Sequence, residues 1–459
     1  MNARKKHILI IPLLFSFSIG LVAQTVYHHK GKKTPLTLNE NKTDVNIPKD
    51  SVENTLENAN ELWDSRDSAA STPNICRDDL TFPNDPDFNK QWGLYNSDSF
   101  YLGIDISICP AWNYATGENV KIAVFDTGVD LNHIDLASNI SDISYDTETH
   151  TSPSRVYKNH ATHCAGIAAA VKDNSIHIAG VAPDAKIVSI SSPMRKKTEH
   201  LPLKLAEGIR WAYQNGADII SNSWRFLYPH PEIENAIHEA FIYGRQGKGC
   251  IIVFSTGNGG MDSISFPANC NDTILAVGSI RRTGSRDEDS QYGIGLDIVA
   301  PGGKIYSTLP NDTVGYMSGT SMACPHVAGV AALVLERDPE LTVTQVNSII
   351  CRNAKKISGV SFNETKPDGS WNEEYGYGLV DAYSSVINTP KIVYIQNDTI
   401  TGTRTISADI IYVGRDVADR KEHGDVILGQ GDITLNAKSV TIKNSTTVPL
   451  GTKLIIGNQ

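Results

Sequence analysis

Between about residues 80 and 389, short apolar runs alternate with longer helix-like stretches, and this alternation leaves few possible folds. Strands that alternate with helices form a parallel sheet covered by helices on both faces. We therefore predict an α/β domain of three layers, α/β/α, over residues 81–389, with a mostly parallel sheet. The predicted strands are Val120–Phe125, Ile187–Ile190, Ile219–Ile220, Ile251–Phe254 and Ile274–Val277, and the main predicted helices are Leu203–Asn215, Ile233–Arg245 and Thr320–Glu336.

The helical pattern stops after Thr389–Pro390 and gives way to short runs rich in Thr, Val and Ile. Gly, Asn and Asp punctuate these runs, as expected for strands joined by turns. We predict a small all-β module over residues 390–459, resembling stacked short strands but without a fixed repeat length. A contact with a surface or a protein partner is its expected role. The predicted strands are Asp425–Leu428, Asp432–Leu435, Val440–Lys443 and Lys453–Ile456.

The N-terminus has the pattern of a secretory signal peptide, which we place at residues 1–24. Basic residues 4–6 precede the apolar run Ile8–Ala23, after which the chain turns polar at Gln24. The run is shorter than the ~20 apolar residues of a membrane span, so an uncleaved anchor is the weaker alternative. Residues 25–80 are polar with weak apolar periodicity, which indicates a pro-region or linker. We expect a secreted protein (extracellular, cell-surface or periplasmic) with no span in the mature chain.

Charge and cysteine content exclude one class of partner and one class of fold. The chain has 41 Lys and Arg against 51 Asp and Glu, a formal net charge of −10. A protein that binds nucleic acid by neutralising phosphates needs a basic surface, so we expect no nucleic-acid partner. Seven cysteines are too few for a disulfide scaffold, and the odd number leaves at least one thiol free. Cys250 and Cys270 are the predicted pair, and the chain is expected to be a monomer.

Three motifs carry candidate catalytic residues, and the first two hold an Asp and a His. In the first, an apolar strand delivers Asp126 at its carboxyl end, where open α/β folds place their sites, and Gly128 permits a sharp turn. The second, Asn159–Gly166, opens a helix-like run with His160 and His163. Two histidines three residues apart could touch one metal ion, but the motif lacks the Glu and the spacing of a metalloprotease helix.

The third motif, Ser318–Gly329, presents Ser321 on a tight turn that enters a helix. The helix dipole would then face the reacting centre. We place Pro325 in the first helical turn, where its missing N–H lacks an acceptor anyway. The alternative is a Gly/Ser loop that merely caps an Ala-rich helix.

Taken together, these motifs over residues 80–389 resemble the subtilisin-like serine peptidases (subtilases), which have the same Asp, His, Ser order. The resemblance implies that Asp126 orients His160, which takes the proton from Ser321 as Ser321 attacks a peptide carbonyl. It further implies that Asn258, in the Gly-rich loop after Ile251–Phe254, supplies the side-chain amide of the oxyanion hole. The resemblance also implies that the substrates are proteins or peptides.

The resemblance also assigns substrate contacts, and this chain departs from the family there. The two walls of the primary specificity pocket correspond to Ser223, Trp224 and Arg225, and to Ser255, Thr256 and Gly257. The family nearly always has Gly where Arg225 stands, so this side chain would narrow the pocket, recruit an acidic substrate residue or point to solvent. A second departure is Ala161, where the family has Gly. Cys164 lies one turn after His160 and resembles the buried thiol of the cysteine-containing subtilases.

A structural calcium site is implied by resemblance in the segment after the His helix. Asn174-Ser175-Ile176 resembles the family's calcium loop, which here has one extra residue. Oxygen ligands of this kind suit Ca²⁺. Ile134 stands where Pro is usual in the family. The expected ligands are Asp135, Asn174, Gln91, Val171, Ile176 and Ile178.

The function that these motifs imply is hydrolysis of peptide bonds by a secreted serine endopeptidase through an acyl-enzyme intermediate. Two alternatives stay open. A catalytically impaired subtilase scaffold could act as a secreted binding protein if Ala161 or Arg225 blocks the site. An active enzyme could process one physiological target rather than degrade broadly.

Overall fold

A computed structural model describes residues 82–194, 200–429, 431–443, 445–448 and 452–457. The predicted signal peptide (1–24) and the pro-region or linker (25–80) lie outside the described residues. In the part of the chain that the structure describes, no helix is both long enough and apolar enough to cross a membrane.

A seven-stranded sheet with the order β2-β3-β1-β4-β5-β6-β7 forms the centre of the larger domain. Every pairing in this sheet is parallel. Strand β1 lies between β3 and β4, so the chain crosses from one side of β1 to the other after β3, and the carboxyl ends of β1, β4 and β5 lie at one edge. The strands are β1 Lys121–Asp126, β2 Tyr145–Asp146, β3 Lys186–Ser191, β4 Ile219–Asn222, β5 Ile251–Ser255, β6 Ile274–Ile280 and β7 Ile298–Pro301.

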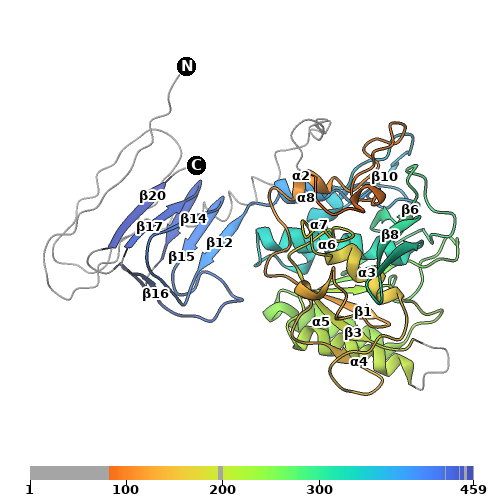
Figure 1. Cartoon of the computed structure of the whole chain (residues 1–459), viewed down its shortest axis with the longest axis horizontal. Helices are drawn as coiled ribbons and strands as arrows, with labels where there is room; N and C mark the ends of the chain where they lie inside the picture. Colours follow the sequence, from red (N-terminus) through yellow and green to blue (C-terminus); the bar gives the residue numbers. More distant parts are fainter. Residues whose placement is uncertain (1–81, 195–199, 430, 444, 449–451, 458–459) are drawn as a thin grey trace, which may run out of the picture. The chain divides into compact units, whose positions relative to one another are not determined.

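Helices cover both faces of the sheet, which confirms the predicted α/β/α layers. Helices α3 and α6 pack together on one face, and α4 and α5 pack together on the other (Figure 1). Strands β1, β4, β5 and β6 are almost entirely buried, as expected for a sheet enclosed by two helix layers. The helices are α2 Ile108–Ala111, α3 His160–Ala169, α4 Leu201–Gln214, α5 Pro231–Tyr243, α6 Thr320–Arg337, α7 Val343–Arg352 and α8 Ala382–Ile387.

One glycine sets the distance between α4 and the sheet. A Cβ on Gly208 would lie 2.2 Å from Cζ of Phe125, a fully buried ring near the end of β1. Only a residue without a side chain lets the helix lie this close to the ring. Two antiparallel hairpins flank the domain, formed by β8 Ile305–Leu309 with β9 Thr313–Met317 and by β10 Glu364–Lys366 with β11 Gly369–Trp371.

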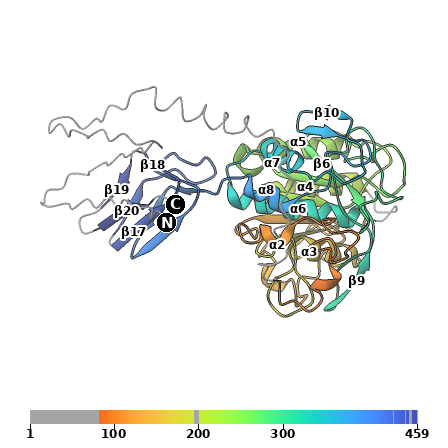
Figure 2. The same cartoon turned by 90° about the horizontal axis from the view of Figure 1, so that it is seen from above.

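The C-terminal strands form a short parallel coil of three sheets, so the predicted stacking of short strands is confirmed. The sheets are β12-β15-β18, β13-β16-β19 and β14-β17-β20, with every pairing parallel (Figure 1 and Figure 2). Each turn of the coil adds one strand to each sheet, and the inward side chains form a separate apolar core that includes Ile411, Val426 and Ile433. The strands are β12 Ile392–Ile395, β13 Asp398–Ile400, β14 Arg404–Ser407, β15 Ile410–Val413, β16 Val426–Leu428, β17 Gly431–Asn436, β18 Ser439–Ile442, β19 Thr446–Thr447 and β20 Thr452–Gly457.

The predicted disulfide between Cys250 and Cys270 is wrong. Both residues are free cysteines. The sequence interval suggested one flanked loop, but Cys250 is buried directly before β5, where its thiol donates to the carbonyl of Ala217. Cys270 lies in the loop before β6, partly exposed.

Candidate active site

Asp126 and His160 meet at the carboxyl edge of the sheet. Asp126 is the last residue of β1, and His160 is the first residue of α3. The Nδ1–H of His160 donates to Oδ2 of Asp126 at 2.8 Å. The second carboxylate oxygen of Asp126 accepts a hydrogen bond from the backbone N–H of Thr127 at 2.6 Å. Asp126 is 2% exposed, so its carboxylate is held in a fixed position beneath the ring.

The Asp126 carboxylate raises the pKa of His160 above its ordinary value of 6.5. Burial alone would lower that pKa, but the negative charge and the hydrogen bond together outweigh it. His163 has a different environment. Its Nε2 lies 3.1 Å from the carbonyl of Ile305, and burial lowers its pKa to about 4. His163 therefore stays neutral, and its Nε2 lies near the carbonyls of both Ile305 and Gly315.

Ser321 lies in the first turn of α6, and the expected position of Pro325 is wrong. Helix α6 begins at Thr320, so Pro325 is inside the helix and not in its first turn. Because proline has no N–H, it cannot bond to the carbonyl four residues earlier, which is that of Ser321. Two side chains satisfy this carbonyl instead: Ser223 donates its hydroxyl at 2.9 Å and Cys164 its thiol at 3.4 Å.

Cys164 connects these catalytic candidates. Its Sγ lies within 4.8 Å of ligand atoms of Asp126 and His160, and it contacts the Ser321 carbonyl. Burial raises the pKa of Cys164 well above its ordinary value, which keeps the group a neutral thiol. Ala161, the departure beside His160, is fully buried. The geometry favours packing for Cys164, whose thiol lies between the Asp126–His160 pair and the carbonyl of Ser321.

Asn258 is fixed through its oxygen, which leaves its amide nitrogen available. Oδ1 accepts hydrogen bonds from the backbone N–H and from the hydroxyl of Thr320, both at 2.9 Å. Asn258 is exposed and lies three residues after the end of β5. The Thr320 hydroxyl also accepts a bond from the N–H of Gly257 at 3.2 Å. Thr320 was not predicted, and its place directly before Ser321 is the only sequence signal for it.

Both predicted walls contact the start of α6, through Ser223 to Ser321 and through Gly257 to Thr320, and three of their side chains are buried. The indole of Trp224 is turned into the core, 4.9 Å from the ring of Phe254 and 8% exposed. Thr256 is fully buried, and Ser255 is 4% exposed. The Ser321 hydroxyl lies 3.5 Å from the carbonyl of Ser223 on the other wall.

Gly257 and Arg225 complete the walls. Gly257 has a φ of +111°, and a Cβ there would lie 2.1 Å from Oε1 of Gln291, so this wall position requires glycine. Arg225 is exposed, and its Nη1 donates to the hydroxyl of Ser265 at 3.2 Å.

Comparison with known proteins agrees with this geometry. Residues 117–378 match the subtilase family of S8 peptidases. Thermitase from Thermoactinomyces vulgaris is 35% identical over 305 residues, which cover 66% of this chain and 99% of thermitase. The chain belongs to the subtilase family. Subtilisin BL from Lederbergia lenta is 35% identical over 268 residues, covering 58% of this chain and 90% of that protein. A solved protease structure from Pseudoalteromonas arctica PAMC 21717 aligns with a TM-score of 0.56 and 31% identity, covering 67% of this chain and 100% of that chain.

As a subtilase, the chain is a subtilisin-like serine endopeptidase, a hydrolase that acts on protein substrates. Thermitase, the subtilisins and a thermophilic serine proteinase from a Bacillus strain all fall within this class by name.

The predicted calcium ligands of this subtilase lie together. Asp135 accepts hydrogen bonds from Nδ2 of Asn174 at 2.8 Å and from the N–H of Ile178 at 3.1 Å, and its own carbonyl accepts from the N–H of Val171. Gln91 contacts Ala179, the residue after Ile178. Its Oε1 accepts from the N–H of Ala179, and its Nε2 donates to the Ala179 carbonyl. The oxygen of Asn174 accepts from the N–H of Ile176.

The chemistry of this cluster fits a hard cation. Asp135 is fully buried and forms no ion pair among the described residues, and burial raises its pKa to about 7. A buried carboxylate without a cationic partner is a group that a bound cation would stabilise. In the structure the oxygens of Asn174 and Gln91 accept backbone hydrogen bonds, so an ion would have to replace these contacts.

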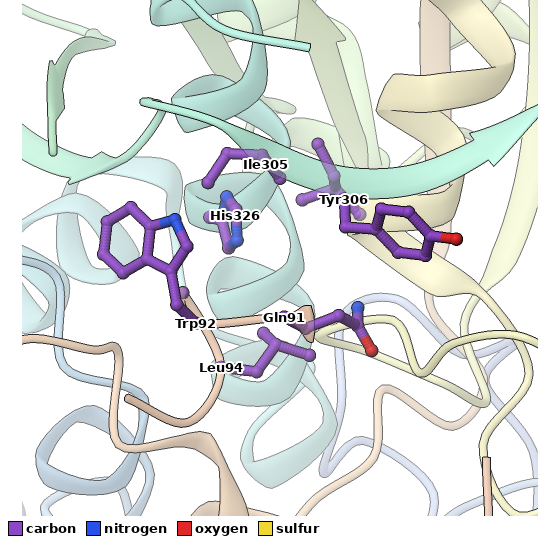
Figure 3. A pocket seen from close by; sticks show the side chains of 8 residues that line it. Gln91, Trp92, Leu94, Ile305, Tyr306 and His326 are labelled. Atoms are coloured by element: carbon purple, nitrogen blue, oxygen red, sulfur yellow. The ribbon is translucent and has the colours of Figure 1, made fainter. Parts of the chain in front are cut away.

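A small internal cavity lies between α6, β8 and the segment before α2 (Figure 3). His326 faces it from α6, donates from Nδ1 to the carbonyl of Met322 at 2.8 Å, and has its pKa lowered to about 4 by burial. His326 is therefore a neutral core residue, and the cavity contains none of the catalytic candidates. Its lining residues are Gln91, Trp92, Gly93, Leu94, Ile167, Ile305, Tyr306 and His326.

Proposed function

We propose that this endopeptidase acts through Asp126, His160 and Ser321 as a secreted enzyme. The observation that carries the proposal is the 2.8 Å hydrogen bond from His160 Nδ1 to the buried Asp126 carboxylate. That bond fixes the tautomer in which Nε2 of His160 carries no proton and can accept one. The apolar N-terminal run and the family membership support export.

The reaction begins when the Ser321 hydroxyl attacks the substrate carbonyl. Its proton moves to Nε2 of His160, and the Asp126 charge stabilises the imidazolium that forms. The C–N bond then breaks, and His160 gives the proton to the leaving amine. Water hydrolyses the acyl ester by the same proton transfer and returns Ser321 to its starting state.

Two donors stabilise the oxyanion of the tetrahedral intermediate. The first is the backbone N–H of Ser321, in the first turn of α6, where helical N–H groups have no partner within the helix. The second is Nδ2 of Asn258, since Thr320 occupies the opposite end of that amide. Preorganised donors of this type contribute more than any other single term to many enzymatic rate enhancements.

Structural calcium is a second part of the proposal. Side-chain oxygens of Asp135, Asn174 and Gln91 would hold the ion, together with backbone carbonyls of Val171, Ile176 and Ile178. The buried carboxylate of Asp135 supports this assignment. Bound there, the ion would supply charge compensation and tie the chain after α3 to the N-terminal segment.

A fluorophosphonate probe tests the catalytic assignment. The purified chain, with residues 1–80 removed, should gain the mass of one adduct, and a Ser321→Ala variant should gain none. A second variant, Asp126→Asn, should react far more slowly because the His160 tautomer is no longer fixed. A folded sample that forms no adduct would contradict the proposal and favour the catalytically impaired scaffold.

A further inference from the structure

The chain separates beside the nucleophile and rejoins a few residues later. Strands β4 and β5 pair in parallel as far as Asn222 and Phe254. The next connection between these parts of the chain is the bridge between Phe226 and Phe266, where the N–H of Phe226 donates to the Phe266 carbonyl at 2.8 Å. Residues 223–225 therefore lie between two fixed points but outside the sheet.

Ser321 contacts this unpaired segment. Its hydroxyl lies 3.5 Å from the Ser223 carbonyl, and its own carbonyl accepts from the Ser223 hydroxyl. We use the term specificity region for residues 223–225, residues 255–257 and Ser265. A substrate carbonyl attacked by Ser321 places the side chain of its own residue, the P1 residue, next to this region.

The side chain of Arg225 crosses the specificity region from one wall to the other. Its Cδ lies 3.0 Å from the position a Cβ would take on Gly257, so the aliphatic stem packs on the opposite wall. Its Nη1 reaches the Ser265 hydroxyl at 3.2 Å. That hydroxyl is nearly buried and donates to Oε1 of Gln291 at 2.9 Å. A neutral chain of hydrogen bonds thus holds the guanidinium in place.

The charge of Arg225 is not compensated by the protein. Within the described part of the chain, no carboxylate oxygen lies within 4.0 Å of its nitrogens, and its hydrogen-bond partner is a neutral hydroxyl. A guanidinium has five N–H donors in a planar fork that matches a carboxylate. Most of these donors remain available to a bound substrate.

We propose that Arg225 makes this enzyme selective for substrates with glutamate or aspartate at P1. The inference rests on the proposed function, because it requires Ser321 to be the nucleophile. The carboxylate of the P1 residue pairs with the remaining N–H donors of the guanidinium, while the Ser265 hydroxyl, itself bonded to Gln291, holds Nη1. Pre-positioning by this neutral network reduces the ordering cost of forming the pair.

Four fluorogenic peptides that differ only at P1 (Glu, Gln, Phe or Ala) test the proposal. Glu and Gln have nearly the same shape, so their ratio of kcat/KM isolates charge. At low ionic strength the wild-type enzyme should favour Glu over Gln by on the order of tenfold or more. Added salt should reduce this ratio, because Arg225 is exposed.

Three variants separate the effect of the charge of Arg225 from the effect of the size of its side chain. Arg225→Gln removes the charge, and the Glu/Gln ratio should fall to about one. Arg225→Gly also removes the stem, so cleavage after Phe should rise while the Glu/Gln ratio stays near one. Arg404→Gln removes an exposed arginine from β14, in the C-terminal coil, and should leave the ratio at its wild-type value.

Labelling each variant with the fluorophosphonate probe distinguishes a failure of the proposed acidic preference from a failure of the proposed catalytic function. A wild-type enzyme that labels but cleaves Glu and Gln peptides equally would overturn the acidic preference alone. A preference for Ala that only Arg225→Gly relieves would show that the side chain narrows the region, and would also overturn it. A chain that neither labels nor cleaves would overturn the proposed function and this inference with it.

Discussion

Removal of the Asn258 amide gives the sharpest test of the site's chemistry. Its oxygen is held by two bonds of 2.9 Å from Thr320, so Nδ2 is the end that we propose donates to the oxyanion. Asn258→Asp keeps an oxygen for Thr320 but replaces the donor with a negative charge. Asn258→Ala removes both ends. The side chain is exposed, so neither change opens a cavity in the core.

The expected loss follows from the number of donors. One of two oxyanion donors is lost, and the other, the N–H of Ser321, is unchanged. In subtilisin itself such a loss lowers kcat by about 10²–10³-fold, or about 2.7–4 kcal/mol. We expect the same range for Asn258→Ala and a larger loss for Asn258→Asp, because its charge repels the oxyanion. KM should change little, since the donor acts mainly in the transition state.

The assay is steady-state hydrolysis of a peptide substrate, with enzyme concentration fixed by active-site titration. Thr320→Val is the matched control for how the Asn258 side chain is positioned. It removes one of the two bonds that orient Asn258 but leaves the amide, so its kcat should fall by only about tenfold. An Asn258→Ala enzyme that retains kcat within a factor of five of wild type would refute the oxyanion assignment.

Three further predictions concern other parts of the molecule. Catalysis needs neutral His160, whose pKa the Asp126 charge raises, so kcat/KM should fall as pH decreases through a midpoint above 6.5; a pH–rate profile with a lower midpoint would contradict this. Gly208→Ala should destabilise the domain by about 1–3 kcal/mol in urea unfolding, since the new Cβ would meet Phe125 at 2.2 Å, and an unchanged midpoint would contradict this packing. EDTA should lower the melting temperature, and calcium should restore it, in the wild type but not in Asp135→Asn; a wild-type melting temperature that ignores both reagents removes the calcium site.

The layers of the fold were predictable because the apolar runs are short, strongly hydrophobic and bounded by turns. The observed strands and helices lie within a few residues of the predicted ones, as for β5 and α4. Four strands between Ile392 and Val413 were not predicted, because each is short and only half-buried, so its apolar alternation is weak. Burial by neighbouring turns of the coil, not the local sequence, stabilises these strands.

For the site, local motifs predicted which residues meet but not how they are held. The Asp126–His160 contact follows from two motifs that the fold brings to one edge. The anchoring of Asn258 by Thr320 depends on side-chain geometry between distant segments, which spacing along the chain does not encode. The supposed pairing of Cys250 failed for the same reason, since loop length alone does not determine whether two thiols meet.

The carbonyl of Ser321, left free by Pro325, joins three segments of the chain that are far apart in the sequence. Through this one atom Ser321 is tied to Ser223, directly after β4, and to Cys164 on α3. Loosening any one of the three segments breaks a bond to another, so partial opening is penalised at several places at once. Local opening next to Ser321 therefore costs the bonds of two other segments as well as its own.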